Sequence, residues 1–127
     1  MNIRRLETIL VLLIGLHSFI LGCAMALQPM RTLNLFGWDY QGPMFFPTQA
    51  GVFLALFGIL FVIFIWHRRL IWFIIVIKSA AVVFLLYQNY ILVPAAPYTI
   101  LLAAVFDGLM ALSVAGILIL RVYVNNH

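Results

Sequence analysis

Two apolar stretches decide the fold of this chain: IWFIIVIKSAAVVFLLY at residues 71–87 and YTILLAAVFDGLMALSVAGILIL at residues 98–120. Each is close to the roughly 20 residues that an α-helix needs to cross a bilayer. An open strand leaves its backbone unpaired in lipid, so both stretches are predicted to be helices. Each holds one ionisable residue, Lys78 in the first and Asp107 in the second. Because a charge at such depth is costly, it is usually paired or functional.

The composition of the whole chain supports a membrane location. Of its 127 residues, 67% are hydrophobic and 8% are charged, whereas a soluble domain has about 25% charged residues. This small number of charges cannot cover a surface exposed to water. Residues 1–127 are therefore predicted to form a single integral membrane domain. The net charge of +4 does not indicate nucleic-acid binding, because the basic residues stand at the ends of apolar runs.

Four apolar runs have the length of a membrane span, and we expect helices at about residues 6–27, 48–66, 70–93 and 98–120. The breaks between them are marked by Pro29, by Pro43 and Pro47, by His67-Arg68-Arg69 and by Pro94-Ala95-Ala96-Pro97. Short connections make neighbouring helices antiparallel. The predicted fold class is all-α, an antiparallel bundle of four transmembrane helices.

The basic residues predict the orientation of the bundle. Five arginines fall on one side of the four-span layout, and the other side has only Arg31, offset by Asp39. The five are Arg4, Arg5, Arg68, Arg69 and Arg121. By the positive-inside rule both termini are cytoplasmic and the loop at residues 28–47 is not. We predict an integral protein of the bacterial inner (cytoplasmic) membrane.

The first run also resembles a secretory signal, since Arg4 and Arg5 precede it and Ala24-Met25-Ala26 stands near its end. Its apolar run of about 20 residues is longer than a usual signal core, so we expect a retained first helix. The loop at residues 28–47 is unusually apolar and contains Trp38 and Tyr40. We interpret it as an interfacial anchor, with a lid over a pocket in the bundle as the alternative.

Small residues recur at helical spacing in three of the runs, which predicts close helix contacts. They are Gly15, Ser18, Gly22 and Ala26; Gly51, Ala55 and Gly58; and Ala104, Gly108, Ala111 and Ala115. Asp107 shares its face with this last group, so it is predicted to point into the packed seam.

The pair of Lys78 and Asp107 is the main candidate site. Counted from the ends of their runs, Lys78 lies about 12 Å deep and Asp107 about 21 Å deep, so contact is plausible without being required. Three roles remain open: a structural ion pair, a site for the polar head of a ligand, and proton or ion handling. Lys78 can also extend its side chain to the cytoplasmic headgroups.

Three further polar residues are candidates for a ligand-binding or buried polar role. His17 stands in the middle of the first run, where it can form a relay if it faces Asp107. Gln49 and Asn89 can line an opening on the non-cytoplasmic side. Glu7 is expected to pair locally with Arg4, one turn earlier. The histidines do not have a metal-ligand spacing, and we find no catalytic set, so we assign neither metal-binding nor catalytic residues.

The motif Phe46-Pro47-x-Gln49-x-Gly51-x-Phe53-x-x-x-Phe57-Gly58-Ile59 is followed by Lys78 and then by Asp107-x-x-Met110-Ala111. In these features the chain resembles small four-helix membrane proteins of the DoxX-like group, including BphX-like proteins. The resemblance covers about two-thirds of the chain and implies a compact four-helix membrane bundle. Named members are linked to quinone-coupled oxidation or lie beside aromatic-degradation genes. The resemblance implies that Gln49, Lys78 and Asp107 occupy polar positions of the pattern of this group.

Together these features favour a non-enzymatic subunit or binding module that holds a lipid, quinone or other apolar molecule near Lys78 and Asp107. The alternatives are a small proton-coupled membrane carrier that uses Asp107, and an accessory subunit of a membrane oxidoreductase complex. Membrane lipid, a larger membrane complex and further copies of the chain are the expected partners, and nucleic acid is not expected. The sequence leaves open whether the protein is an enzyme and whether it has a cofactor.

Overall fold

The fold is known from a computed structural model that describes residues 2–92 and 98–126. The described residues form five α-helices and no strand: α1 (Ile3–Leu27), α2 (Pro29–Leu35), α3 (Phe45–Ile63), α4 (Trp72–Tyr87) and α5 (Tyr98–Asn125). A short 3₁₀ turn, η1 (Arg68–Leu70), precedes α4, and a π-helical turn, η2 (Gln88–Leu92), follows it. Four segments are long and apolar enough to cross a membrane: α1, α3, Arg68–Ile91 and α5. The predicted all-α bundle of four transmembrane helices is confirmed.

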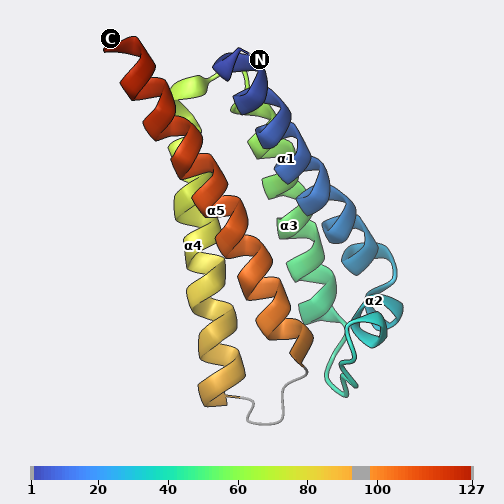
Figure 1. The fold of residues 1–127 in the computed structure, drawn as a ribbon. Helices are drawn as coiled ribbons and strands as arrows, with labels where there is room; N and C mark the ends of the chain where they lie inside the picture. The colour runs from blue at the N-terminus through green and yellow to red at the C-terminus, as the bar shows by residue number, and fades with distance from the viewer. Residues whose placement is uncertain (1, 93–97, 127) are drawn as a thin grey trace.

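The four long helices lie side by side as two pairs (Figure 1). Helix α1 packs along α3, α4 packs along α5, and the pairs meet mainly through α1 and α5. Both chain ends lie at one end of the bundle, here called the terminal end. Helix α2 lies at the opposite end, here called the loop end. Consecutive long helices are therefore antiparallel, as the short connections predict.

The helix ends follow from local chemistry. Helix α1 starts at Ile3, before the predicted residue 6, because the Asn2 side chain accepts a hydrogen bond from the Arg4 backbone N–H and caps the first turn. Pro47 was expected to precede the second span but lies inside the first turn of α3, where its missing N–H costs no hydrogen bond. Helix α5 continues to Asn125 instead of ending at residue 120. The predicted break at residues 94–97 lies outside the described residues.

Glycines bring α1 and α3 into backbone contact. A Cβ added to Gly22 would lie 2.2 Å from the backbone nitrogen of Ala55. One added to Gly51 would lie 2.4 Å from the backbone nitrogen of Ala26, and one on Gly58 would lie 2.6 Å from the carbonyl oxygen of Gly15. Contacts this short are not tolerated, so the predicted small-residue seam between the first two spans is confirmed.

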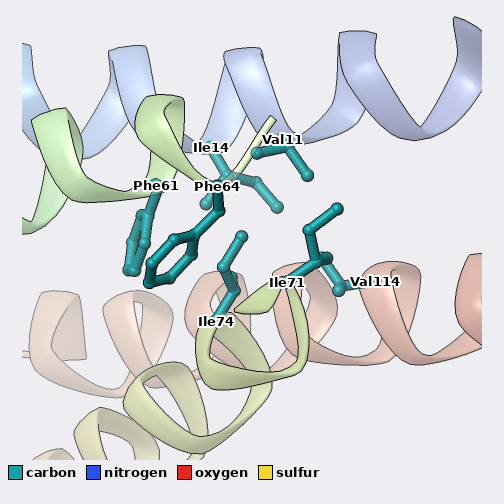
Figure 2. Close-up of a cluster of buried hydrophobic side chains, with 7 residues drawn as sticks. All are labelled: Val11, Ile14, Phe61, Phe64, Ile71, Ile74 and Val114. Atoms are coloured by element: carbon teal, nitrogen blue, oxygen red, sulfur yellow. The ribbon is translucent and has the colours of Figure 1, made fainter. Parts of the chain in front are cut away.

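A cluster of buried apolar side chains joins the two helix pairs in the terminal half of the bundle (Figure 2). All four long helices or the residues directly next to them contribute to it. Its members are Val11, Ile14, Phe61, Phe64, Ile71, Ile74 and Val114. This cluster holds α4 and α5 against α1 and α3. It therefore determines which residues of α4 and α5 lie opposite a given turn of α1.

The loop at residues 28–47 is folded against the loop end of the bundle. Gly37, at a φ of 74°, ends α2, and the backbone N–H of Trp38 bonds back to the carbonyl of Leu33 at 3.0 Å. Buried Thr32 donates its hydroxyl to the carbonyl of Ala24 in α1, at 2.9 Å. The hydroxyl of Thr99 in α5 donates to the carbonyl of Phe36. The loop is thus held to one helix of each pair, and the choice between anchor and lid stays a prediction.

Candidate functional site

Lys78 of α4 and Asp107 of α5 form a buried ion pair. The Lys78 Nζ donates to the Asp107 Oδ1 at 2.6 Å. Lys78 is 4% exposed as a residue, and the Asp107 side chain is 18% exposed. Lys78 therefore extends toward α5, and the alternative in which it reaches for the headgroups is not the conformation found here. The contact that the sequence left open is formed.

Counting along the two runs separates Lys78 and Asp107 by about 9 Å in depth, a difference that left their contact open. The count assumes that residues 70 and 121 lie at the same height in the membrane. The two segments differ in length, 28 residues for α5 and 24 for Arg68–Ile91, so counting from their ends does not fix how they are offset. The long lysine side chain can also bridge a difference in height. Axial offset between helices is a tertiary property that counting along a single helix does not give.

The ion pair keeps unused hydrogen-bonding capacity. A lysine ammonium has three N–H donors and a carboxylate has two accepting oxygens. Among the described residues, Lys78 uses one of its three donors and Asp107 one of its two oxygens, in the hydrogen bond between them. In an apolar interior an unmet polar group is costly. A polar group of a bound molecule would therefore be favoured at this point.

Helix α1 carries two further polar residues, His17 and Ser18. His17 lies within electrostatic reach of both Lys78 and Asp107, although its side chain is exposed. The next residue, Ser18, is fully buried, and its hydroxyl has no hydrogen-bond partner in the described part of the chain. Ser18 follows Val11 and Ile14 along the face of α1 that enters the buried cluster. His17 is therefore the α1 residue linked to the ion pair, and no described contact joins Ser18 to it.

Ser18 is predicted only as a small packing residue, and the sequence does not predict that its buried hydroxyl has no partner among the described residues. The available signal was a hydroxyl on a seam of small residues, next to the one histidine within a predicted span. A serine on such a seam commonly bonds to a backbone carbonyl one turn earlier, so sequence alone did not single it out.

Gln49 and Asn89 do not join the ion pair. Asn89 lies in η2, eleven residues beyond Lys78, which is about 16 Å along the helix axis. Gln49 is exposed in the first half of α3, toward the loop end. Their predicted place at an opening on that side of the bundle stays a prediction.

A second polar cluster, which the sequence reasoning missed, lies at the terminal end. Glu7 of α1 is 2% exposed and accepts a hydrogen bond from the Arg121 Nη1 of α5 at 3.3 Å. The Arg68 Nη1 of η1 lies 3.6 Å from the same carboxylate oxygen. Glu7 therefore pairs across the bundle, and the expected local pair with Arg4 is not formed. The two arginines are distant in sequence, so the spacing that suggested Arg4 gave no indication of them.

Within the described residues there is no group of three metal-ligating side chains. Comparisons with protein-family models, with curated proteins and with solved structures find no match to this chain. The resemblance to DoxX-like proteins therefore stays a prediction. The fold and the site define a small integral membrane protein of four spans, with a buried ion pair inside its second helix pair.

Proposed function

We propose that this integral membrane protein is a binding module that holds the polar head of a lipid-soluble molecule, a quinone or another lipid, beside Lys78 and Asp107. One observation carries the proposal: between two spans, buried Lys78 pairs with half-buried Asp107, yet the described contacts leave two lysine N–H groups and one aspartate oxygen unused. A quinone carbonyl or a lipid hydroxyl accepts or donates hydrogen bonds with these groups.

The neighbouring groups support a ligand of this kind. His17 of α1 interacts electrostatically with both charges and adds a polar group on that side of the pair. Small-molecule sites are mostly apolar with a few polar groups that fix orientation, which is the composition of this region. A redox or catalytic step is not part of the proposal, because no residue set for one has been identified.

In this proposal both termini face the cytoplasm and the membrane is the inner membrane of a bacterium, on the strength of the arginine distribution. The protein acts as a subunit, within a larger membrane complex or as a homo-oligomer. The loop at residues 28–47 then lies at the outer surface, where its apolar side chains contact headgroups or cover the loop end of the bundle.

The experiment is to identify what the protein retains after purification in a mild detergent, by native mass spectrometry and by chromatography of the extracted lipids. We expect wild type to retain a lipid-soluble molecule in stoichiometric amount. The test variant is Lys78→Met with Asp107→Leu, which removes both charges together. A buried pair replaced by apolar residues often leaves the fold stable. This variant is expected to retain the helical fold and to lose the molecule.

Ser79→Ala is the matched control, because it also removes a polar group from α4 but at an exposed position next to Lys78 in the chain. It is expected to leave the retained molecule unchanged. Empty spectra for wild type, or equal retention by the double variant, would contradict the proposal.

A small proton-coupled carrier is the second candidate, favoured by the Asp107 carboxylate that meets Lys78 between two membrane spans. Ionisable groups that meet within a membrane bundle are a common feature of proton pathways. A carrier predicts flux that depends on a pH gradient across reconstituted vesicles and that is abolished by Asp107→Asn. Flux that survives this change excludes Asp107 as the coupling group.

A further inference from the structure

The terminal end of the bundle contains a basic cavity, separate from the ion pair of α4 and α5. Its volume is about 440 Å³, within the range of roughly 300–1,000 Å³ that small-molecule sites occupy. Three arginines line it, one from each of three elements that are far apart in the chain: Arg4 from α1, Arg68 from η1 and Arg121 from α5. The remaining lining residues are Asn2, Ile3, Val124 and Asn125.

The cavity has an excess of positive charge. Glu7 is the carboxylate that pairs with Arg68 and Arg121, and it is not among the residues that line the cavity. Counted over the described residues, three guanidinium groups and one carboxylate leave two positive charges uncompensated at this place. Arginine remains charged at any physiological pH, so this excess is permanent.

The arginines also have hydrogen-bonding capacity to spare. The Arg68 Nη1 is shielded from solvent and donates no hydrogen bond within the described chain. The described contacts of Arg4 are made by its backbone, so its guanidinium group takes no part in them. A guanidinium group carries five N–H donors in a planar fork that matches the oxygens of a phosphate. Donors and charge together favour an anion with several oxygens.

The position of the cavity in the membrane indicates which kind of anion it binds. It lies where α1 begins and α5 ends, that is, at the limit of two membrane spans. Trp66 and Trp72, both exposed, stand at the same end, and tryptophan is enriched at the headgroup level of a bilayer. Ile3 and Val124 give the cavity apolar wall as well as charged wall. A phospholipid presents a phosphate and an adjoining apolar part at this depth.

We propose that the cavity lined by Arg4, Arg68 and Arg121 binds the phosphate of an anionic phospholipid. Glu7 pairs with Arg68 and Arg121 and so holds these two arginines in position. Arg4 of α1 contributes the third guanidinium group. An anionic lipid is favoured over a zwitterionic one, because two uncompensated charges attract a net negative headgroup and oppose the ammonium group of a zwitterion. The proposal is independent of the ligand at Lys78 and Asp107.

The test uses native mass spectrometry of the full chain in a nonionic detergent, with phosphatidylglycerol and phosphatidylcholine of identical acyl chains. Wild type is expected to bind phosphatidylglycerol in preference. Arg4→Gln is the informative variant, since the Arg4 side chain makes no described contact in the fold and its loss leaves the Glu7 pairs intact. Its affinity for phosphatidylglycerol is expected to fall about tenfold, as for the loss of one charge-assisted hydrogen bond.

Arg69→Gln is the control. It makes the same change of charge at an exposed residue of the same turn as Arg68, outside the cavity, and is expected to bind as wild type does. Equal affinity for the two lipids, or equal losses in the two variants, would show attraction by overall charge only and would overturn the proposal. Inorganic phosphate that displaces phosphatidylglycerol and itself binds in an Arg4-dependent way would assign the site to free phosphate. If neither lipid nor inorganic phosphate binds, the proposed site does not exist.

Discussion

Glu7 and Arg121 lie 3.3 Å apart, although 114 residues separate them in the chain. One is in the second turn of α1 and the other is near the end of α5, so their contact joins the first and last membrane spans. Arg68 approaches the same carboxylate from between α3 and α4. A single acidic side chain therefore ties three parts of the bundle together at the terminal end.

Glu7→Gln should destabilise the bundle. The amide keeps the shape of the side chain but removes the charge that Arg68 and Arg121 share. Both arginines are about one-third exposed and can turn to water or headgroups, so we expect a loss of about 1–3 kcal/mol, below the value for a fully buried pair. The free energy of unfolding is measured by titration with a denaturing detergent in mixed micelles, followed by tryptophan fluorescence. Arg5→Gln, at an exposed residue, is the control and should change little.

Replacing glycine by alanine is expected to have opposite effects inside and outside the glycine seam between α1 and α3. Gly22→Ala places a Cβ 2.2 Å from the Ala55 backbone nitrogen, so the helices must separate, at a cost of about 1–3 kcal/mol. Gly116→Ala, in α5, places a Cβ with nothing within 4 Å. There alanine should be neutral or stabilising by up to about 1 kcal/mol, because it favours the helix. Equal unfolding free energies for the two variants would contradict the seam.

The contrast between what the sequence predicted and what it missed has a physical cause. The four spans were predictable because bilayer thickness sets a length that hydropathy alone detects. The seam was predictable because Gly22 follows Ser18, and Ala55 follows Gly51, by one helical turn of four residues. The contact of Lys78 with Asp107 was left open because it depends on how far one helix slides along another. The partners of Glu7 were missed for a similar reason, since contacts between distant helices are not written in local spacing.

The ion pair predicts non-additive stability changes. Lys78→Met leaves the Asp107 carboxylate unpaired, and Asp107→Asn leaves the Lys78 ammonium without its countercharge. Each single change is expected to cost about 3 kcal/mol, since an uncompensated buried charge is worse than none. The double variant should recover at least about 1 kcal/mol relative to the sum. The same mixed-micelle titration measures all four proteins, and simple additivity would mean that the two side chains do not interact in the folded protein.

The orientation of the bundle can be tested with the single cysteine of the chain. Cys23 lies within α1, near its loop end, and Cys23→Ala gives a background for labelling. In that background Asn126→Cys marks the terminal end and Gln41→Cys marks the exposed loop at the other end. With both termini cytoplasmic, a membrane-impermeant maleimide added to intact spheroplasts should label Gln41→Cys and leave Asn126→Cys unlabelled until the membrane is opened. The reverse pattern would invert the topology and place the arginine cavity at the outer surface. Because the positive-inside rule rests on five arginines against one, we expect the first result.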